Sequence, residues 1–356
     1  MSIMQMMLGA SGGAYDGINA TGGDSAVETV IDGDKYMVHT FLSDGNFIVT
    51  KEGEYDAIIV GGGGGGKFYG GGGGGGAVIH VEDKTIGTGA TEGSPITYAI
   101  VIGDGGAFNG QFDPDLPSSA TYYRTCPTAG THNGESTTFD GYTSTGGGAG
   151  GGYDYCTALA GANAGGDASI LNIRTGTTGV APTGDSKTTV YAGNSSNGGD
   201  KSEYYERTFS GGAGAGGDAL QTTDISIAGF ANGGPGIQIN IDGNNYYWGG
   251  GGGGYCEYNN GSYTAGNGTT YGPFAKGCQG GIGGGGAGHT YSSQWDECDG
   301  GGSAINSGSD ADAYRSGDGG ANTGGGGGAL SWPASDGNGA RPGAGGSGIV
   351  IIRYRI

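Results

Sequence analysis

The sequence predicts a mainly β and irregular fold: a frame of β-strands, packed polyglycine helices, long tyrosine-rich loops and almost no α-helix. Three observations predict it. Glycine supplies 93 of the 356 residues, against roughly 7% in an ordinary protein, and it stands in unbroken blocks. Short apolar segments rich in β-branched and aromatic residues border these blocks, and turn residues separate them. Apolar residues at helical spacing are almost absent.

The β-frame is expected to begin with a hairpin of residues 36–42 and 46–50 around a Ser-Asp-Gly turn. Residues 55–60 follow as a buried strand, because four apolar residues run together. A C-terminal strand is expected at residues 348–354, and its residues 349–354 are expected to pair beside residues 56–60, since both are apolar runs that adjoin glycine. Further candidate strands are residues 77–81, 96–102, 136–139, 224–227 and 237–241.

The glycine blocks are residues 61–66, 70–76, 146–152, 249–254, 280–288 and 324–328. Polyglycine can form an extended left-handed helix with three residues per turn and no internal hydrogen bonds. Buried N–H and C=O groups then need partners in neighbouring segments, which can approach closely because glycine has no Cβ. The blocks therefore predict a core of packed polyglycine II-type helices. Glycine-rich strands or mobile loops are the alternatives for any one block.

Composition excludes several other classes. Collagen needs glycine at every third position with abundant proline, and only 9 residues here are proline. Disordered chains are usually rich in charge and poor in aromatics, whereas this chain is 13% charged and 10% aromatic. The formal net charge of −20 repels phosphate backbones, so nucleic acid is not an expected partner. No apolar stretch approaches the roughly 20 residues that cross a bilayer, so membrane insertion is not expected either.

Residues 1–33 are predicted to be an N-terminal attachment or oligomerisation segment, and residues 34–356 a glycine-rich β/polyglycine domain with surface loops. The segment starts with an apolar cluster, and adaptable methionine side chains suit a groove on another subunit or particle. Alternatively, the cluster folds back onto its own chain or forms an oligomer core. The candidate attachment residues are Ile3, Met4, Met6, Met7 and Leu8.

The order of these pieces resembles the glycine-rich domain proteins of tailed bacteriophages. The matching motifs are TFLSDGNFIV at residues 40–49, YDAIIVG at 55–61, TYAIVIGDGG at 97–106, GESTTFDG at 134–141 and GGSGIVIIRY at 345–354. The resemblance implies a virion structural protein similar to tail-fibre adhesins, assembled in the host cytoplasm and exposed on the virion surface. Its expected partners are other virion proteins and a host glycan or outer-membrane protein. The chain is also expected to form a homo-oligomer, with a trimer favoured. A head or tail decoration protein is the alternative.

Catalytic and cofactor motifs are absent or incomplete. An apolar strand, six glycines and Lys67 imitate a phosphate-binding loop, but Phe68 stands where the magnesium-binding hydroxyl is needed. None of the four histidines lies in a recognisable catalytic signature. The five cysteines form no C-x-x-C pair, and the acidic pairs complete no EF-hand pattern. We therefore expect no enzyme activity, no cofactor and no metal.

Aromatic residues between the glycine blocks are the candidate binding residues. Tyrosine and tryptophan give rigid contact area, and neighbouring serine, glycine and asparagine add adaptable hydrogen bonds, as in other loop-built recognition surfaces. Alternatively, the rings cap the glycine helices or fill subunit contacts. The receptor-binding candidates are Tyr246, Tyr247, Trp248, Tyr255, Tyr258, Tyr263, Tyr291 and Trp295.

Overall fold

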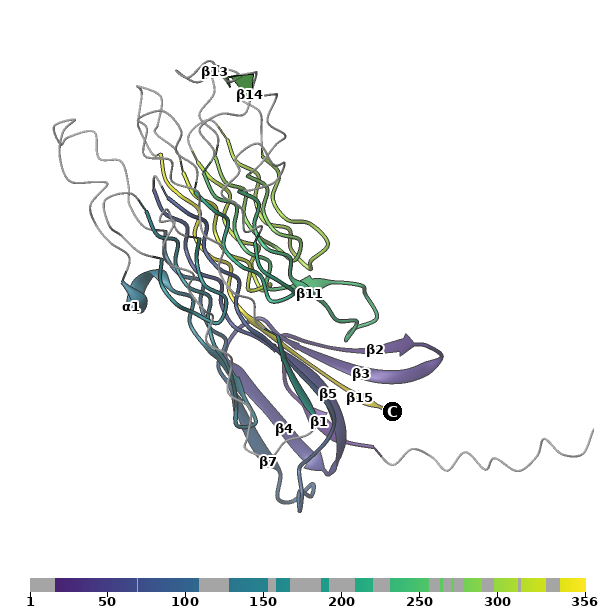
Figure 1. The fold of residues 1–356 in the computed structure, drawn as a ribbon. Helices are drawn as coiled ribbons and strands as arrows, with labels where there is room; N and C mark the ends of the chain where they lie inside the picture. The colour runs from purple at the N-terminus through teal and green to yellow at the C-terminus, as the bar shows by residue number, and fades with distance from the viewer. Residues whose placement is uncertain are drawn as a thin grey trace, which may run out of the picture.

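A β-sandwich and a bundle of glycine-rich segments make up the described part of this computed structural model (Figure 1). The strands of the two sheets lie at one end, and the glycine-rich segments run away from them side by side (Figure 1). The predicted class, mainly β and irregular, is confirmed, since the one helix among the described residues, α1 (Ala129–His132), has four residues. The structure describes residues 17–68, 70–108, 128–152, 158–166, 187–191, 209–219, 231–255, 263–264, 270–271, 278–289, 298–312, 315–330 and 340–356.

Two antiparallel sheets form the sandwich. The larger has the order β10 (Thr188–Tyr191), β6 (Val78–Ile86), β5 (Gly53–Val60), β15 (Ile349–Arg355), β3 (Asp34–Phe41) and β2 (Ser25–Ile31). The smaller has the order β1 (Asn19–Thr21), β4 (Gly45–Lys51) and β7 (Ile96–Ile100). Three strand pairs lie outside them: β8 (Thr137–Phe139) with β9 (Tyr142–Ser144), β11 (Ile237–Gln238) with β12 (Tyr247–Trp248), and β13 (Tyr263–Thr264) with β14 (Thr270–Tyr271).

The C-terminal strand β15 lies in the centre of the larger sheet, between β5 and β3. Ile349 is opposite Val60, and Arg353 is opposite Asp56, in antiparallel register. The predicted pairing of residues 349–354 beside residues 56–60 is therefore confirmed. Both strands carry continuous apolar runs because both faces of the sheet are covered here.

The predicted hairpin of residues 36–42 and 46–50 was wrong in its pairing. Its strands exist as β3 and β4, but β3 pairs with β2 and β15, whereas β4 pairs with β1 and β7. The turn between them therefore carries the chain from one sheet to the other. This crossing lets both Phe41 and Phe47 bury their rings, 6.4 Å apart, in the core between the sheets.

The hairpin of this region is β2–β3, and β2 was not among the predicted strands. Its two-residue turn consists of Asp32 and Gly33, with φ values of 51° and 92°, as a type I′ turn requires. Strand β1 belongs to the smaller sheet and β2 to the larger one. The described residues before the predicted domain boundary at residue 33 are therefore part of the β-sandwich. The candidate attachment residues Ile3, Met4, Met6, Met7 and Leu8 lie outside the described residues.

At its centre, in β5 and β15, the larger sheet is buried on both faces. One face packs against the smaller sheet in a cluster that includes Ala57 and Ile59. The other face contributes Ile58 and Val60 to a second cluster, which contains Trp248. The run Ala-Ile-Ile-Val thus alternates between two cores, because successive strand residues project to opposite faces.

The glycine-rich segments hydrogen-bond to one another, and we call this set of segments, between residues 61 and 348, the glycine bundle. Successive N–H groups of residues 61–67 donate to three different neighbours in turn, and the direction repeats every third residue. The pairs are Gly61–Ala77, Gly64–Gly74 and Lys67–Gly71; Gly62–Glu135 and Gly65–His132; and Gly63–Gly346 and Gly66–Gly343. The backbone of one segment is therefore satisfied by three others.

The glycine bundle has no room for side chains at most of these positions. A Cβ on Gly63 would lie 2.0 Å from the carbonyl oxygen of Gly325, and one on Gly73 would lie 2.0 Å from that of Gly64. A Cβ on Gly251 would lie 2.1 Å from the carbonyl oxygen of Gly212. Backbones touch backbones, so the glycine blocks are packed interior, as predicted. Residues 211–217, 233–236 and 343–346, which were not among the predicted blocks, contribute in the same way.

Two adjacent glycines test this packing. A Cβ on Gly301 would lie 1.8 Å from the carbonyl oxygen of Gly281, whereas one on Gly302 would meet nothing within 4 Å. Gly301→Ala should lower the free energy of unfolding by about 1–3 kcal/mol or more, because two backbones must separate. Gly302→Ala should leave it unchanged or raise it by about 0.4–1 kcal/mol, since the unfolded chain loses entropy. Urea denaturation measures both, and equal effects would contradict backbone contact as the determinant.

His39, a buried residue of β3, forms hydrogen bonds toward both sheets. Its Nδ1 lies 2.7 Å from the carbonyl oxygen of Gly22, next to β1, and its Nε2 lies 3.2 Å from the hydroxyl of Tyr354 in β15. Burial lowers the pKa of His39 below its usual 6.5, against a smaller opposite effect of the Gly22 carbonyl. The neutral imidazole is therefore the form that fits this site.

Acid should weaken the fold through His39. Below pH 6.5 the unfolded chain binds a proton at His39 more readily than the folded chain, so stability falls as the pH drops from 6.5 toward the folded pKa. The loss from one such group is at most about 1.4 kcal/mol per pH unit. His39→Gln cannot titrate and should flatten this part of the stability profile in urea denaturation. Parallel wild-type and variant profiles would contradict the role of His39.

Candidate functional site

Trp248 is buried, which corrects its prediction as a receptor-binding residue. Its side chain has 0% exposure and belongs to the cluster on the larger sheet with Ile58 and Ile351. Its indole N–H donates to the carbonyl oxygen of Ile239 at 3.2 Å. The predicted alternative, in which an aromatic ring packs at the end of a glycine block, describes this residue.

Tyr255 is also buried, with 1% exposure, so its prediction as a receptor-binding residue was wrong as well. Its ring stacks on that of Phe209 with the centroids 5.7 Å apart. The backbone N–H of Phe209 donates to the carbonyl oxygen of Tyr255 at 3.0 Å, which continues the pairing of residues 209–215 with residues 249–255. The run 249–254 is thus closed by a packed aromatic residue at each end.

Tyr246 and Tyr247 are half-buried beside an exposed turn. Tyr246 meets Trp248 edge-to-face, with the ring centroids 6.0 Å apart, and packs against the second core cluster. In the turn, the N–H of Asn244 donates to the Asp242 carboxylate at 3.0 Å. This aromatic segment therefore lies beside the larger sheet and combines packing with partial exposure.

The remaining candidates lie farther along the chain. Tyr263 is in β13, opposite Tyr271 of β14, and this pair lies at the end of the glycine bundle away from the sandwich (Figure 1). Tyr258, Tyr291 and Trp295 lie outside the described residues. The structure therefore does not bring the eight candidates together at one place.

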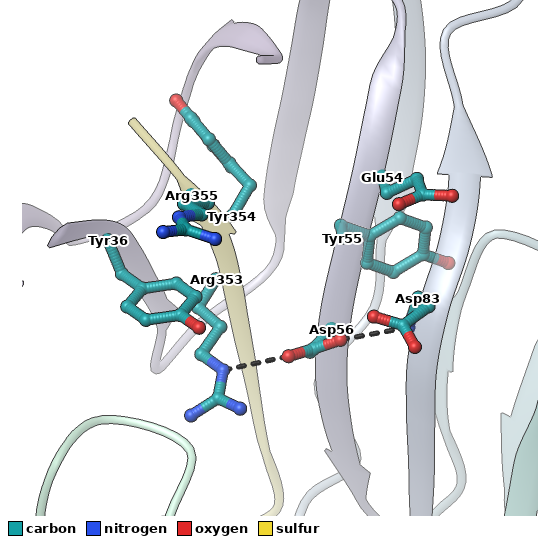
Figure 2. Close-up of a pocket in the computed structure, with 8 residues that line it drawn as sticks. All are labelled: Tyr36, Glu54, Tyr55, Asp56, Asp83, Arg353, Tyr354 and Arg355. Atoms are coloured by element: carbon teal, nitrogen blue, oxygen red, sulfur yellow. Dashed lines mark hydrogen bonds and ion pairs between the residues drawn. The ribbon is translucent and has the colours of Figure 1, made fainter. Parts of the chain in front are cut away.

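A polar pocket lies on the larger sheet where β3, β5, β6 and β15 meet (Figure 2). Arg353 and Asp56 face each other across neighbouring strands, with Nε and Oδ2 2.9 Å apart. The second Asp56 oxygen accepts the backbone N–H of Asp83 at 2.9 Å. The lining residues are Tyr36, Glu54, Tyr55, Asp56, Asp83, Arg353, Tyr354 and Arg355.

Arg353 of this pocket is held by three kinds of contact. Besides Asp56, its guanidinium lies 5.0 Å from the centre of the Tyr36 ring and donates to the carbonyl oxygen of Asn240 at 3.0 Å. Asn240 precedes the turn that leads to Tyr246. Arg353 therefore fastens the half-buried aromatic segment to the sheet, a role that was not predicted from the sequence.

The imitation of a phosphate-binding loop does not act as one. The N–H groups of residues 61–66 all donate to backbone carbonyl oxygens of neighbouring segments, so these six groups do not cradle an anion. Lys67 is fully buried, and burial lowers its pKa to about 8. The run is an interior segment of the glycine bundle.

One disulfide lies in the glycine bundle. Cys278 and Cys298 are bonded, with their Cα atoms 5.8 Å apart, in a small buried cluster with Ala287 and Ala311. It joins two cysteines that are 20 residues apart in the chain. The other three cysteines of the sequence lie outside the described residues.

No protein-family model matches this chain, and no curated protein matches it. Within the described ranges, no group of three or more His, Cys, Asp or Glu side chains is placed to hold a metal ion. No helix in the same part of the chain is long and apolar enough to cross a membrane.

Alanine substitutions at the adjacent residues Tyr247 and Trp248 compare a half-buried aromatic side chain with a fully buried one. Trp248→Ala should lower the free energy of unfolding by about 3–5 kcal/mol, because it empties a buried site against the larger sheet. Tyr247→Ala, at a half-buried position, should cost clearly less. Urea denaturation of both variants measures the difference, and equal small losses would show that the indole is not a core residue.

Proposed function

We propose that this chain is a non-enzymatic structural protein of a bacteriophage virion, an adhesin of the tail-fibre type that binds a host-cell surface receptor through loops carried by the glycine bundle. It works without a cofactor or a metal. Its partners are other virion proteins and a host glycan or outer-membrane protein. The observation that carries the proposal is a packed interior of glycine backbone, which extends from the sandwich toward β13 and β14 (Figure 1).

The glycine bundle supports this proposal through its hydrogen bonding. A donor direction that repeats every three residues fits a helix with three residues per turn, so we assign the glycine runs to polyglycine II-type helices. Such a core is stabilised by backbone hydrogen bonds and close contact instead of large side chains. The sequence motifs that resemble phage glycine-rich domain proteins fall in β3, β4, β5, β7, β8 and β15, which form or adjoin the frame of this bundle.

The direction of the chain also supports the proposal. Residues 249–254 lead from Trp248, packed on the larger sheet, to Tyr255, and the next described residues are β13 at the far end (Figure 1). The described N-terminal strand β1 and the C-terminus lie at the sandwich end (Figure 1). Attachment to the particle then falls to the sandwich end and receptor binding to the far end. Loops held by a rigid base lose less entropy on binding.

A decoration protein of the head or tail, with a purely structural role, is the second candidate. The burial of Trp248 and Tyr255 favours it in part, because two aromatic residues next to glycine serve packing instead of recognition. Labelling virions with an antibody against this chain separates the two. Signal at the distal tail supports the adhesin, and uniform signal over the capsid supports decoration.

The receptor surface is tested at Tyr258 and Trp295, two predicted receptor-binding residues that lie outside the described ranges. Tyr258→Ala and Trp295→Ala should each lower the adsorption affinity by about 1–3 kcal/mol, because aromatic anchors dominate such interfaces. Their melting temperatures should stay near the wild-type value, and Trp248→Ala provides the contrast of a variant that loses stability first. Phage adsorption and thermal melting are measured side by side. Normal adsorption at normal stability would remove both residues from the receptor surface.

A further inference from the structure

Strand β2 is an edge of the larger sheet and pairs with β3 alone. The hairpin β2–β3 extends beyond the rest of the sheet (Figure 1). Because a two-residue turn joins the strands, Ile31 and Asp34 form a hydrogen-bonded pair, and the bonding alternates from there along the register. The N–H and C=O groups of Ala26, Glu28 and Val30 therefore face away from β3. No backbone partner binds them within the described part of the chain.

This edge lacks most features that prevent strands from pairing between molecules. Its register with β3 runs without a bulge over seven residue pairs, and it contains no proline. Val27 and Val30 are 55% and 63% exposed, on opposite faces. Glu28 carries the only charge in the strand. An exposed, regular, β-branched edge of this kind is a template for another strand.

We propose that β2 pairs with β2 of a second copy of this chain, antiparallel about a two-fold axis at Thr29, so that two larger sheets become one. In this register Thr29 lies opposite Thr29 of the second copy, Val27 opposite its Ile31, and Glu28 opposite its Val30. The outward groups of Glu28 and Val30 then bond to each other reciprocally. The pairing is isologous, because both copies use the same surface.

The side chains select this register over its neighbours. Moving the axis by one residue to Glu28 keeps the hydrogen-bonding pattern but places two glutamates directly opposite each other, which is unfavourable. Moving it to Val27 places Val30 opposite Asp24, whose N–H already donates to Thr40 at 2.8 Å. With the axis at Thr29, threonine meets threonine and valine meets isoleucine, and both kinds of cross-strand pair are stabilising.

Lys35 offsets the charge of Glu28 at the new seam. Lys35 is exposed and lies opposite Val30 in the hairpin. In the dimer, Val30 of one copy therefore lies between its own Lys35 and Glu28 of the other copy. The two glutamates thus lie between two lysines on one face of the joined sheet. Exposed charges at these separations are partly screened by salt.

Sedimentation velocity of the full chain tests the interface. The wild-type protein should form a dimer whose fraction rises with protein concentration. Glu28→Pro removes only an outward N–H, so it should leave the hairpin intact and weaken dimerisation at least about tenfold, or 1.4 kcal/mol. Glu28→Gln keeps the N–H and should dimerise as well as wild type or better. A monomeric wild type, or a Glu28→Pro variant that dimerises normally at wild-type melting temperature, would overturn the proposal.

Disulfide trapping tests the register. Two cysteines at position 29 would lie in a non-hydrogen-bonded pair, with Cα atoms about 4.5 Å apart, within the range that a disulfide spans. Thr29→Cys should therefore give a covalent dimer under mild oxidation, above the background of wild type with its five native cysteines. Ala26→Cys, on the same strand and exposed, should not. Equal cross-linking of both variants, or of neither, would reject this register.

Discussion

The missing Cβ of glycine is the constraint on which the rest of this structure depends. In an ordinary core, side chains hold backbones apart and supply most of the buried surface. Here a Cβ at Gly63, Gly73 or Gly251 would sit about 2 Å from a carbonyl oxygen of another segment. Segments can therefore lie in direct contact, and each satisfies its backbone hydrogen bonds with several neighbours at once.

The β-sandwich gives this bundle its starting register. Strands β5 and β6 continue directly into residues 61–66 and 70–76, and β15 follows residues 343–348. The pairing of Val60 with both Val78 and Ile349 sets which glycines meet beyond the sheet. Trp248, which packs on the same sheet, sets the position of residues 249–254 in the same way. Large apolar residues are thus needed only at the base, where they align segments that cannot align themselves through side chains.

Sequence patterns predicted the parts of the fold in which an apolar composition requires burial. The apolar runs of β5 and β15 predicted a central pair of strands, because few other environments accept such runs beside glycine. The pattern around Phe41 and Phe47 did not reveal that β3 and β4 lie in different sheets, since either arrangement buries both rings. An aromatic residue next to glycine looks the same whether it faces water or, like Trp248, a sheet. The Asp-Gly turn after β2 was the available signal for the hairpin that was missed.

The way the glycine bundle is hydrogen-bonded also determines how its amides meet solvent. Glycine stretches are ordinarily mobile linkers whose N–H groups exchange with water almost at once. In this chain the N–H groups of residues 61–66 and 71–76 are bonded to carbonyls of neighbouring segments and are buried. Opening any one of them requires several segments to separate, so these amides belong to the cooperative unit of highest local stability. Deuterium uptake in this protein would thus be slowest where its sequence is simplest.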